Sequence, residues 1–193
     1  MLKKLVVALL FCAGLCAVAR LGTAAAQEKK PADKGDEVEV PPLSPKAVAN
    51  REKIDKVFDK YTEKYAPKDG KTYCNVFASL ATEELGSKVP QKLANHQYEW
   101  LLNEGKEKGG QEVSAAEGQK LANQGYIVVA SWQNPDPTKH GHIAVVRPYA
   151  EHPFSAEKGP RISQFGSHNK KDVAASETFG KRLPDTKFFA QMK

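Results

Sequence analysis

The sequence predicts an α+β domain in which helices pack on a small antiparallel β-sheet. Apolar residues recur at helical spacing from residue 45 to about 124, whereas three short segments after Gly125 are rich in β-branched and aromatic residues. The connection between the first two of these segments is too short to hold a crossover helix, so we expect them to pair as antiparallel strands.

Four helices are expected before Gly125. Ser44 and Pro45 can begin the first, because serine caps a helix and proline presets its first turn, and this helix should end near residues 67–70. The second should cover residues 74–85 and end at Gly86.

The third helix should cover about residues 91–103. Ser114 and Glu117 form a capping-box pattern that predicts the start of a fourth, short helix ending at residues 123–125. The period of the apolar residues then changes from that of a helix to that of a strand. The expected strands are residues 126–132, 142–147 and 161–165.

The tail, residues 177–193, shows no clear periodicity. Its large apolar residues suggest that part of it covers the core: Phe179, Leu183, Phe188 and Phe189.

The chain begins with the pattern of a secretory signal peptide, residues 1–26. Two lysines precede an apolar run, and small residues precede Gln27, which we expect to be the first residue of the mature protein. Cleavage after Ala19 and a retained membrane anchor are the alternatives. Residues 27–46 are charged and contain proline, so they should form a disordered linker before a single domain, residues 47–193.

Composition argues against nucleic acid as a partner. The formal net charge of +6 includes three basic residues of the signal peptide; the mature chain has 26 basic and 23 acidic residues, a net charge of +3. No dense basic patch is interleaved with aromatic residues. We also expect no membrane contact beyond the signal peptide, since no other segment is long and apolar enough to span a bilayer.

Cys74 is the candidate nucleophile. The other cysteines, Cys12 and Cys16, lie in the signal peptide, so an exported chain would keep one thiol and could form no internal disulfide. A helix start stabilises a thiolate through its free backbone amides and its partial positive charge. A small buried thiol packed between helix and sheet is the other interpretation of this residue.

A thiol nucleophile requires a base and a group that orients the base. His142 opens an expected strand and could face the helix start, so it is the candidate base. Gln164, on the next strand, is the candidate orienting residue, with His168 and Asn169 as alternatives. The backbone amide of Cys74 and the hydroxyl of Tyr73 could form an oxyanion hole.

A zinc site is the competing interpretation of these residues. His140 and His142 are spaced to share one face of a strand, and Cys74 could supply a third ligand. His140, however, lies in a proline-containing loop, and no further histidine or carboxylate is aligned with the pair. We therefore expect neither a metal nor another cofactor.

Three segments resemble the papain-like cysteine peptidase superfamily and, within it, the NlpC-type and CHAP peptidoglycan hydrolases. They are residues 72–77 (TYCNVF), 141–146 (GHIAVV) and 162–166 (ISQFG), and the resemblance extends over about residues 65–169. It implies a helical layer on an antiparallel sheet and acyl-enzyme chemistry without a metal. By position it implies Cys74 as nucleophile, His142 as base and Gln164 as the third member.

The sequence is therefore interpreted as an exported bacterial cysteine hydrolase that cleaves an amide bond in peptidoglycan peptides. Two alternatives remain: a non-catalytic wall-binding or structural protein on the same fold, and an acyltransferase that uses the same thiol chemistry. No residue pattern indicates which bond is cut or whether an inhibitor protein is a partner.

Overall fold

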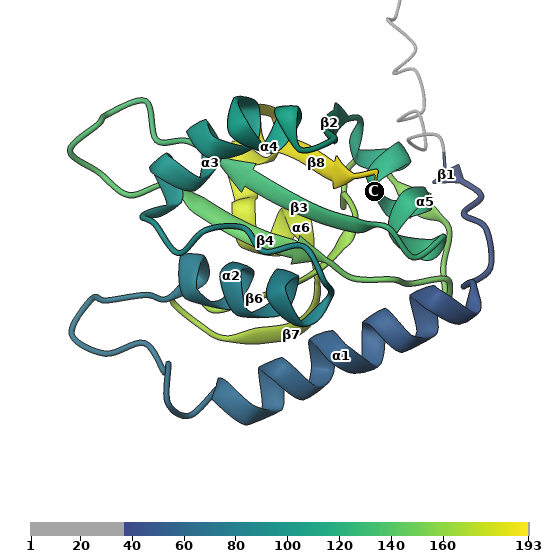
Figure 1. Cartoon of the computed structure of the whole chain (residues 1–193), viewed down its shortest axis with the longest axis horizontal. Coiled ribbons are helices and arrows are strands. Elements are labelled where there is room, and N and C mark those ends of the chain that lie inside the picture. Colours follow the sequence, from purple (N-terminus) through teal and green to yellow (C-terminus); the bar gives the residue numbers. More distant parts are fainter. Residues whose placement is uncertain (1–36, 193) are drawn as a thin grey trace, which may run out of the picture. The chain divides into compact units, whose positions relative to one another are not determined.

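The computed structural model describes residues 37–192 of the chain (Figure 1). The expected signal peptide and residues 27–36 of the expected linker lie outside the described residues.

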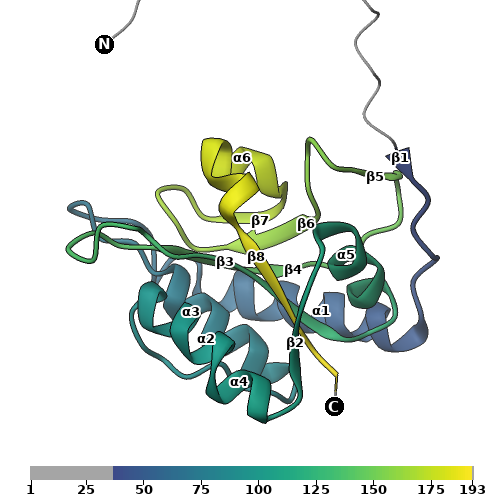
Figure 2. The ribbon, with the colours of Figure 1, turned by 90° about the horizontal axis from the view of Figure 1, so that it is seen from above.

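A six-stranded antiparallel sheet forms the centre of the fold, with the strand order β2-β8-β3-β4-β6-β7. The α+β class and the antiparallel pairing of the expected strands are thereby confirmed. A separate pair of two-residue strands joins β1, at the start of the described chain, to β5 (Figure 2). The strands are β1 (Glu37–Val38), β2 (Gly110–Val113), β3 (Ile127–Trp132), β4 (His142–Val146), β5 (Phe154–Ser155), β6 (Arg161–Gln164), β7 (Lys170–Ala174) and β8 (Lys187–Gln191).

Helices cover both faces of the sheet, as Figure 2 shows. The sequence predicted one helical layer, formed by the helices before Gly125; the fourth of these helices and the C-terminal tail instead form a second layer. The first layer contains α1 (Pro45–Tyr61), α2 (Cys74–Glu84), α3 (Ala94–Leu102) and α4 (Glu104–Glu107). The second contains α5 (Ala115–Asn123), α6 (Ala175–Phe179) and the 3-10 helix η1 (Gly180–Asp185).

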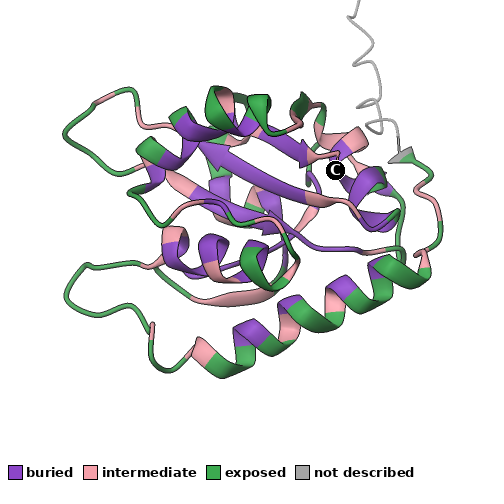
Figure 3. Cartoon of the chain, in the orientation of Figure 1, coloured by how far each residue is buried: buried purple, intermediate pink, exposed green. Residues whose placement is uncertain are grey.

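The core has two halves because successive side chains of a strand point to opposite faces of the sheet. On β4, Ile143 and Val145 belong to the half beneath α1, α2 and α3, whereas Ala144 and Val146 belong to the half beneath α5 and α6. Figure 3 shows the central strands buried along most of their length. The first half holds a cluster of phenylalanine rings: Phe58, Phe77 and Phe165.

Local capping signals placed the helix starts correctly. The Ser44 hydroxyl accepts a hydrogen bond from the amide of Ala47 at 3.1 Å, and Ser114 accepts one from the amide of Glu117 at 3.2 Å. The first helix ends at Tyr61, several residues before the expected proline and glycine.

The fold begins before residue 47, where the expected linker would have ended. Asn123 fixes this segment, since its side chain donates to the carbonyl of Pro41 at 3.0 Å and its own carbonyl accepts from the amide of Ser44 at 2.9 Å. Charge composition alone had suggested disorder there, but these long-range bonds and the β1–β5 pairing order residues 37–46.

No helix within residues 37–192 has the length and apolar character needed to cross a membrane.

Arg147 ties α1 to the sheet. Its side chain is only 8% exposed and binds the Asp55 carboxylate with two nitrogens; the Nη2–Oδ2 distance is 2.8 Å. A second carboxylate, that of Asp172 on β7, lies 3.6 Å from Arg147 Nε. A buried guanidinium is costly without such partners.

We expect Asp55→Ala to lower the free energy of unfolding by about 2–4 kcal/mol, because it leaves the buried guanidinium with only the more distant carboxylate of Asp172. Glu151→Ala is the control. It removes a similar ion pair with Arg51 that is largely exposed, and it should cost less than about 1 kcal/mol. Urea denaturation of both variants provides the measurement, and equal losses would contradict the assigned role of Arg147.

Candidate active site

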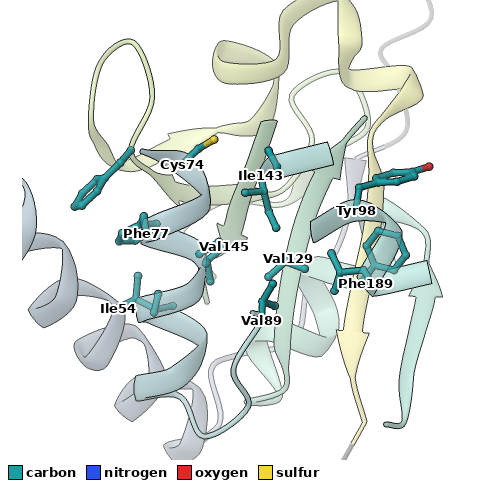
Figure 4. Close-up of a cluster of buried hydrophobic side chains, with 14 of the residues drawn as sticks. Ile54, Cys74, Phe77, Val89, Tyr98, Val129, Ile143, Val145 and Phe189 are labelled. Carbon is teal, nitrogen blue, oxygen red and sulfur yellow. The ribbon is translucent and has the colours of Figure 1, made fainter. Parts of the chain in front are cut away.

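Cys74 is the first residue of α2, as the sequence predicted. The helix packs along β4, with Phe77 in the centre of the first half of the core. Figure 4 shows the Cys74 side chain at the end of α2, beside the strand that carries Ile143. Cys74 is 4% exposed and makes no disulfide within the part of the chain that the structure describes.

Burial and nearby backbone amides have opposite effects on the Cys74 thiol. Burial raises the pKa of the thiol above its ordinary value, because a thiolate loses solvation there. The backbone amides of Ile143, Asn75 and Cys74 oppose that effect and lower the pKa. The thiol is therefore protonated at neutral pH in this arrangement, although the local dipoles favour the thiolate.

His142 is the first residue of β4, but its ring lies on the other face of the sheet from Cys74. It packs edge-on against Phe179 of α6, with 5.2 Å between ring centroids. The sequence predicted that the imidazole would face the helix start. Instead Ile143 faces α2, and because side chains alternate along a strand, His142 points the opposite way.

The imidazole of His142 has no hydrogen bond with the thiol, and its buried Nε2 atom has no hydrogen-bond partner among the described residues. Burial and, as a smaller cause, the positive charge of Arg182 together lower the pKa of His142 to about 4. Arg182 lies over the Trp132 ring on this face, 4.6 Å from its centroid. The ring is therefore neutral at pH 7 and a weak base.

The main chain nevertheless brings the two residues together. The backbone amide of Ile143 lowers the pKa of the Cys74 thiol, so the sulfur lies near the peptide bond that follows His142. The Cα–Cβ bond of His142, however, points to the opposite face of the sheet, so the imidazole and the thiol are separated.

Gln164 lies on the same face as His142. Continuing the pairing of Val145 with Ser163 places Gln164 opposite Ala144, two positions along β4 from His142. Its side chain is buried; Nε2 donates to the carbonyl of His168 at 2.8 Å, and Oε1 has no partner. It therefore does not hold the imidazole by a hydrogen bond in this structure.

The other candidates for the third position have different contacts. Asn169 donates from Nδ2 to the carbonyls of Thr62 and Tyr65, at 3.0 and 3.2 Å, and so ties the β6–β7 loop to the end of α1. His168 is exposed. Tyr73, proposed as an oxyanion donor, packs its ring against that of Tyr65 with 5.3 Å between centroids.

His140 is exposed in the loop before β4 and does not share a strand with His142. Within residues 37–192, no group of three or more histidine, cysteine, aspartate or glutamate side chains is arranged to hold a metal ion.

Two residues that the sequence did not suggest hold the start of α2. Gln97 is fully buried, and its Nε2 donates to the carbonyls of Asn75 and Pro90 at 3.0 and 2.9 Å. The Asn75 side chain in turn donates to the carbonyl of Lys92 at 2.8 Å. Glutamine on an apolar helix face was the only sequence signal that could have indicated this role.

The fold also contains a wide cavity of about 880 Å³ between η1 and the segment from β2 to α5. Its lining includes neither Cys74 nor His142, so this cavity is not part of the candidate active site.

Neither a family model nor a curated protein matches this sequence.

The low pKa of His142 makes stability depend on pH. In the unfolded chain the pKa of the ring is about 6.5. Above that pH the ring is neutral in both states; as the pH falls toward 4, the unfolded state binds a proton that the folded state does not, so the free energy of unfolding decreases. We expect the free energy of unfolding to fall by about 2 kcal/mol more between pH 7.5 and 5 in the wild type than in His142→Asn.

Urea denaturation across this pH range measures the difference. His96→Asn, at an exposed helix position, is the matched control and should retain the pH dependence of the wild type. Identical pH dependence in His142→Asn and wild type would contradict burial of a neutral imidazole.

Proposed function

We propose that this chain is an exported bacterial cysteine hydrolase that cleaves an amide bond in peptidoglycan peptides. Cys74 is the nucleophile, His142 the general base and Gln164 the residue that orients the base. The export assignment rests on the pattern of residues 1–26, and the substrate class on the resemblance of three segments to NlpC-type and CHAP hydrolases.

One observation carries the proposal. A single cysteine occupies the start of an eleven-residue helix, and the backbone amides of Ile143, Asn75 and Cys74 act to lower the pKa of its thiol. Such donors stabilise a thiolate and can also stabilise the oxyanion that forms when the thiolate attacks a carbonyl. The same arrangement, a cysteine helix against a strand that begins with histidine, supports a papain-like fold.

The catalytic state requires the His142 ring to turn from Phe179 toward the sulfur. Because side chains alternate along β4, rotation about the Cα–Cβ bond alone does not carry the ring to the other face; the main chain at the start of β4, where His142 is the first residue, must also turn. Leaving the buried position and the charge of Arg182 also raises the pKa of His142 toward its ordinary value, which makes the ring a better base.

Gln164 suits the orienting role because its Oε1 atom and the Nε2 atom of His142 could form a hydrogen bond with each other. Nε2–H of a neutral ring is a donor and Oε1 of Gln164 is an acceptor, and both are buried without a partner. Both side chains lie on the face opposite Cys74, so the bond must form or persist as the start of β4 turns; it would then satisfy both atoms and leave Nδ1 of His142, the nitrogen nearer the main chain, to accept the thiol proton.

The reaction then proceeds by acyl transfer. The imidazole takes the thiol proton, the sulfur bonds to the amide carbon, and the amide nitrogen leaves with the proton from the imidazolium. Water, deprotonated by the imidazole, hydrolyses the thioester and returns the thiol. During both steps the backbone amides of Cys74 and Asn75 are the donors nearest the developing oxyanion.

A non-catalytic wall-binding or structural protein is the second candidate. Two observations favour it: Cys74 is only 4% exposed, and the ring of His142 packs against Phe179 on the other face of the sheet. In that case the thiol and imidazole contribute only to packing.

We expect Cys74→Ala to abolish hydrolysis of purified peptidoglycan and His142→Ala to lower it at least about 100-fold, because both act in the same step. Gln164→Ala should cost less, and His140→Ala is the matched histidine control and should remain active. Mass spectrometry of the released fragments gives the rates, with folding checked by circular dichroism. Turnover by folded Cys74→Ala would disprove the nucleophile assignment.

Labelling by iodoacetamide separates the two candidate functions. A hydrolase must expose the thiol and turn the imidazole toward it, so native protein should be alkylated at Cys74 near pH 7, and His142→Ala should slow that alkylation. Intact mass measures the extent of reaction. A thiol that reacts only after unfolding, at the same rate in both proteins, would support the non-catalytic candidate.

A further inference from the structure

A second cavity lies at the end of β6 remote from Cys74. Its volume is about 380 Å³, within the range of small-molecule sites. Arg161 begins β6 and lines this cavity, whereas the first residue after the strand, Phe165, belongs to the cluster that contains Cys74. Further side chains that line it are Gln119, Tyr149, His152, Phe154 and Lys158.

Arg161 is held in one orientation at the cavity wall. Its Nε donates to Oδ1 of Asp172 at 2.7 Å, and its guanidinium carbon lies 5.0 Å from the centroid of the Tyr149 ring. The side chain is 28% exposed, and its terminal nitrogens have no hydrogen bond to any described residue. A guanidinium edge of this kind can bind a carboxylate with two parallel hydrogen bonds.

The support of Arg161 extends into the core. Asp172, its carboxylate partner, also lies 3.6 Å from the buried Arg147, which Asp55 of α1 holds. Gln119, which is 3% exposed, accepts from the Arg161 amide at 2.8 Å and donates to the carbonyl of Arg147 at 3.0 Å. The guanidinium is therefore preorganised, which lowers the entropy cost of binding.

The charge balance around the cavity favours an anion. Arg147 and Arg161 are matched by the carboxylates of Asp55 and Asp172, while Lys158 at the rim has no ion-pair partner among the described residues. The cavity also has flat walls, formed by the rings of three residues. They are Tyr149, His152 and Phe154.

We infer that this cavity binds a small ligand that carries a carboxylate on an apolar or ring-shaped body. The carboxylate bonds to the free edge of Arg161 and is attracted by Lys158, and the body packs on Tyr149. The site does not include Cys74, so binding there is independent of the proposed hydrolysis.

Isothermal titration with three probes tests the inference: acetyl-D-alanyl-D-alanine, its C-terminal amide, and N-acetylmuramic acid. The first and third carry a carboxylate on a peptide end and on a sugar, and the second lacks the charge. We expect at least one acid to bind and the amide to bind at least tenfold more weakly. Dipeptide binding alone identifies a peptide end as ligand, and binding of the sugar acid alone identifies a sugar acid.

The variants are Arg161→Gln and Lys158→Gln, with Arg182→Gln as the matched control. Arg182 also stacks on an aromatic ring, but it lies outside the cavity lining. We expect at least tenfold weaker binding for Arg161→Gln, severalfold weaker binding for Lys158→Gln and no change for Arg182→Gln. Because Lys158 is exposed without an ion pair, its variant remains informative if Arg161→Gln unfolds.

Three results would overturn the inference: neither acid binds at tens of millimolar, the amide binds as well as the acid, or the folded Lys158 and Arg161 variants bind like the wild type. The Cys74→Ala protein should bind the probes as the wild type does, so loss of hydrolysis and loss of this site are separate outcomes.

Discussion

The alternation of side chains along β4 determines both the core and the candidate site. Because Ile143 and Val145 pack beneath α2, the residues between and before them must face α6. This gives α2 an apolar surface to rest on and brings the Cys74 sulfur to the amide of Ile143. The same constraint turns the His142 ring to the other face. Alternation along β4 therefore explains both why the main chain of β4 lies near Cys74 and why the side chains of Cys74 and His142 are separated.

The glycines of the histidine and glutamine segments are explained by packing. A β-carbon on Gly141 would collide with Oδ1 of Asn95 and the carbonyl of Trp132, and one on Gly166 would collide with Oε1 of Gln164. Asn95 also donates to the loop before β4, and so fixes the approach to His142. Part of the motif that resembles peptidoglycan hydrolases therefore reflects close backbone approach and would be needed with or without catalysis.

A chain of charges links the first helix to the far end of the sheet. Asp55 on α1 binds Arg147, which lies near Asp172, and Asp172 in turn binds Arg161 at the second cavity. The Asp172 carboxylate lies between the two arginines, so removing one member of the network affects its neighbours. The stability of α1 packing and the orientation of the cavity arginine thus depend on the same network.

The sequence alone determined the features that depend on neighbouring residues. Ser44 and Ser114 cap their helices through bonds to amides three residues away. Such contacts are readable from a few consecutive residues. Tertiary structure decided that β8 inserts between β2 and β3, that residues 37–46 join the fold, and that the His142 ring faces α6. These outcomes follow from long-range pairing and from which strand face packs against which helix, and a shift of one residue in that packing would exchange the two faces.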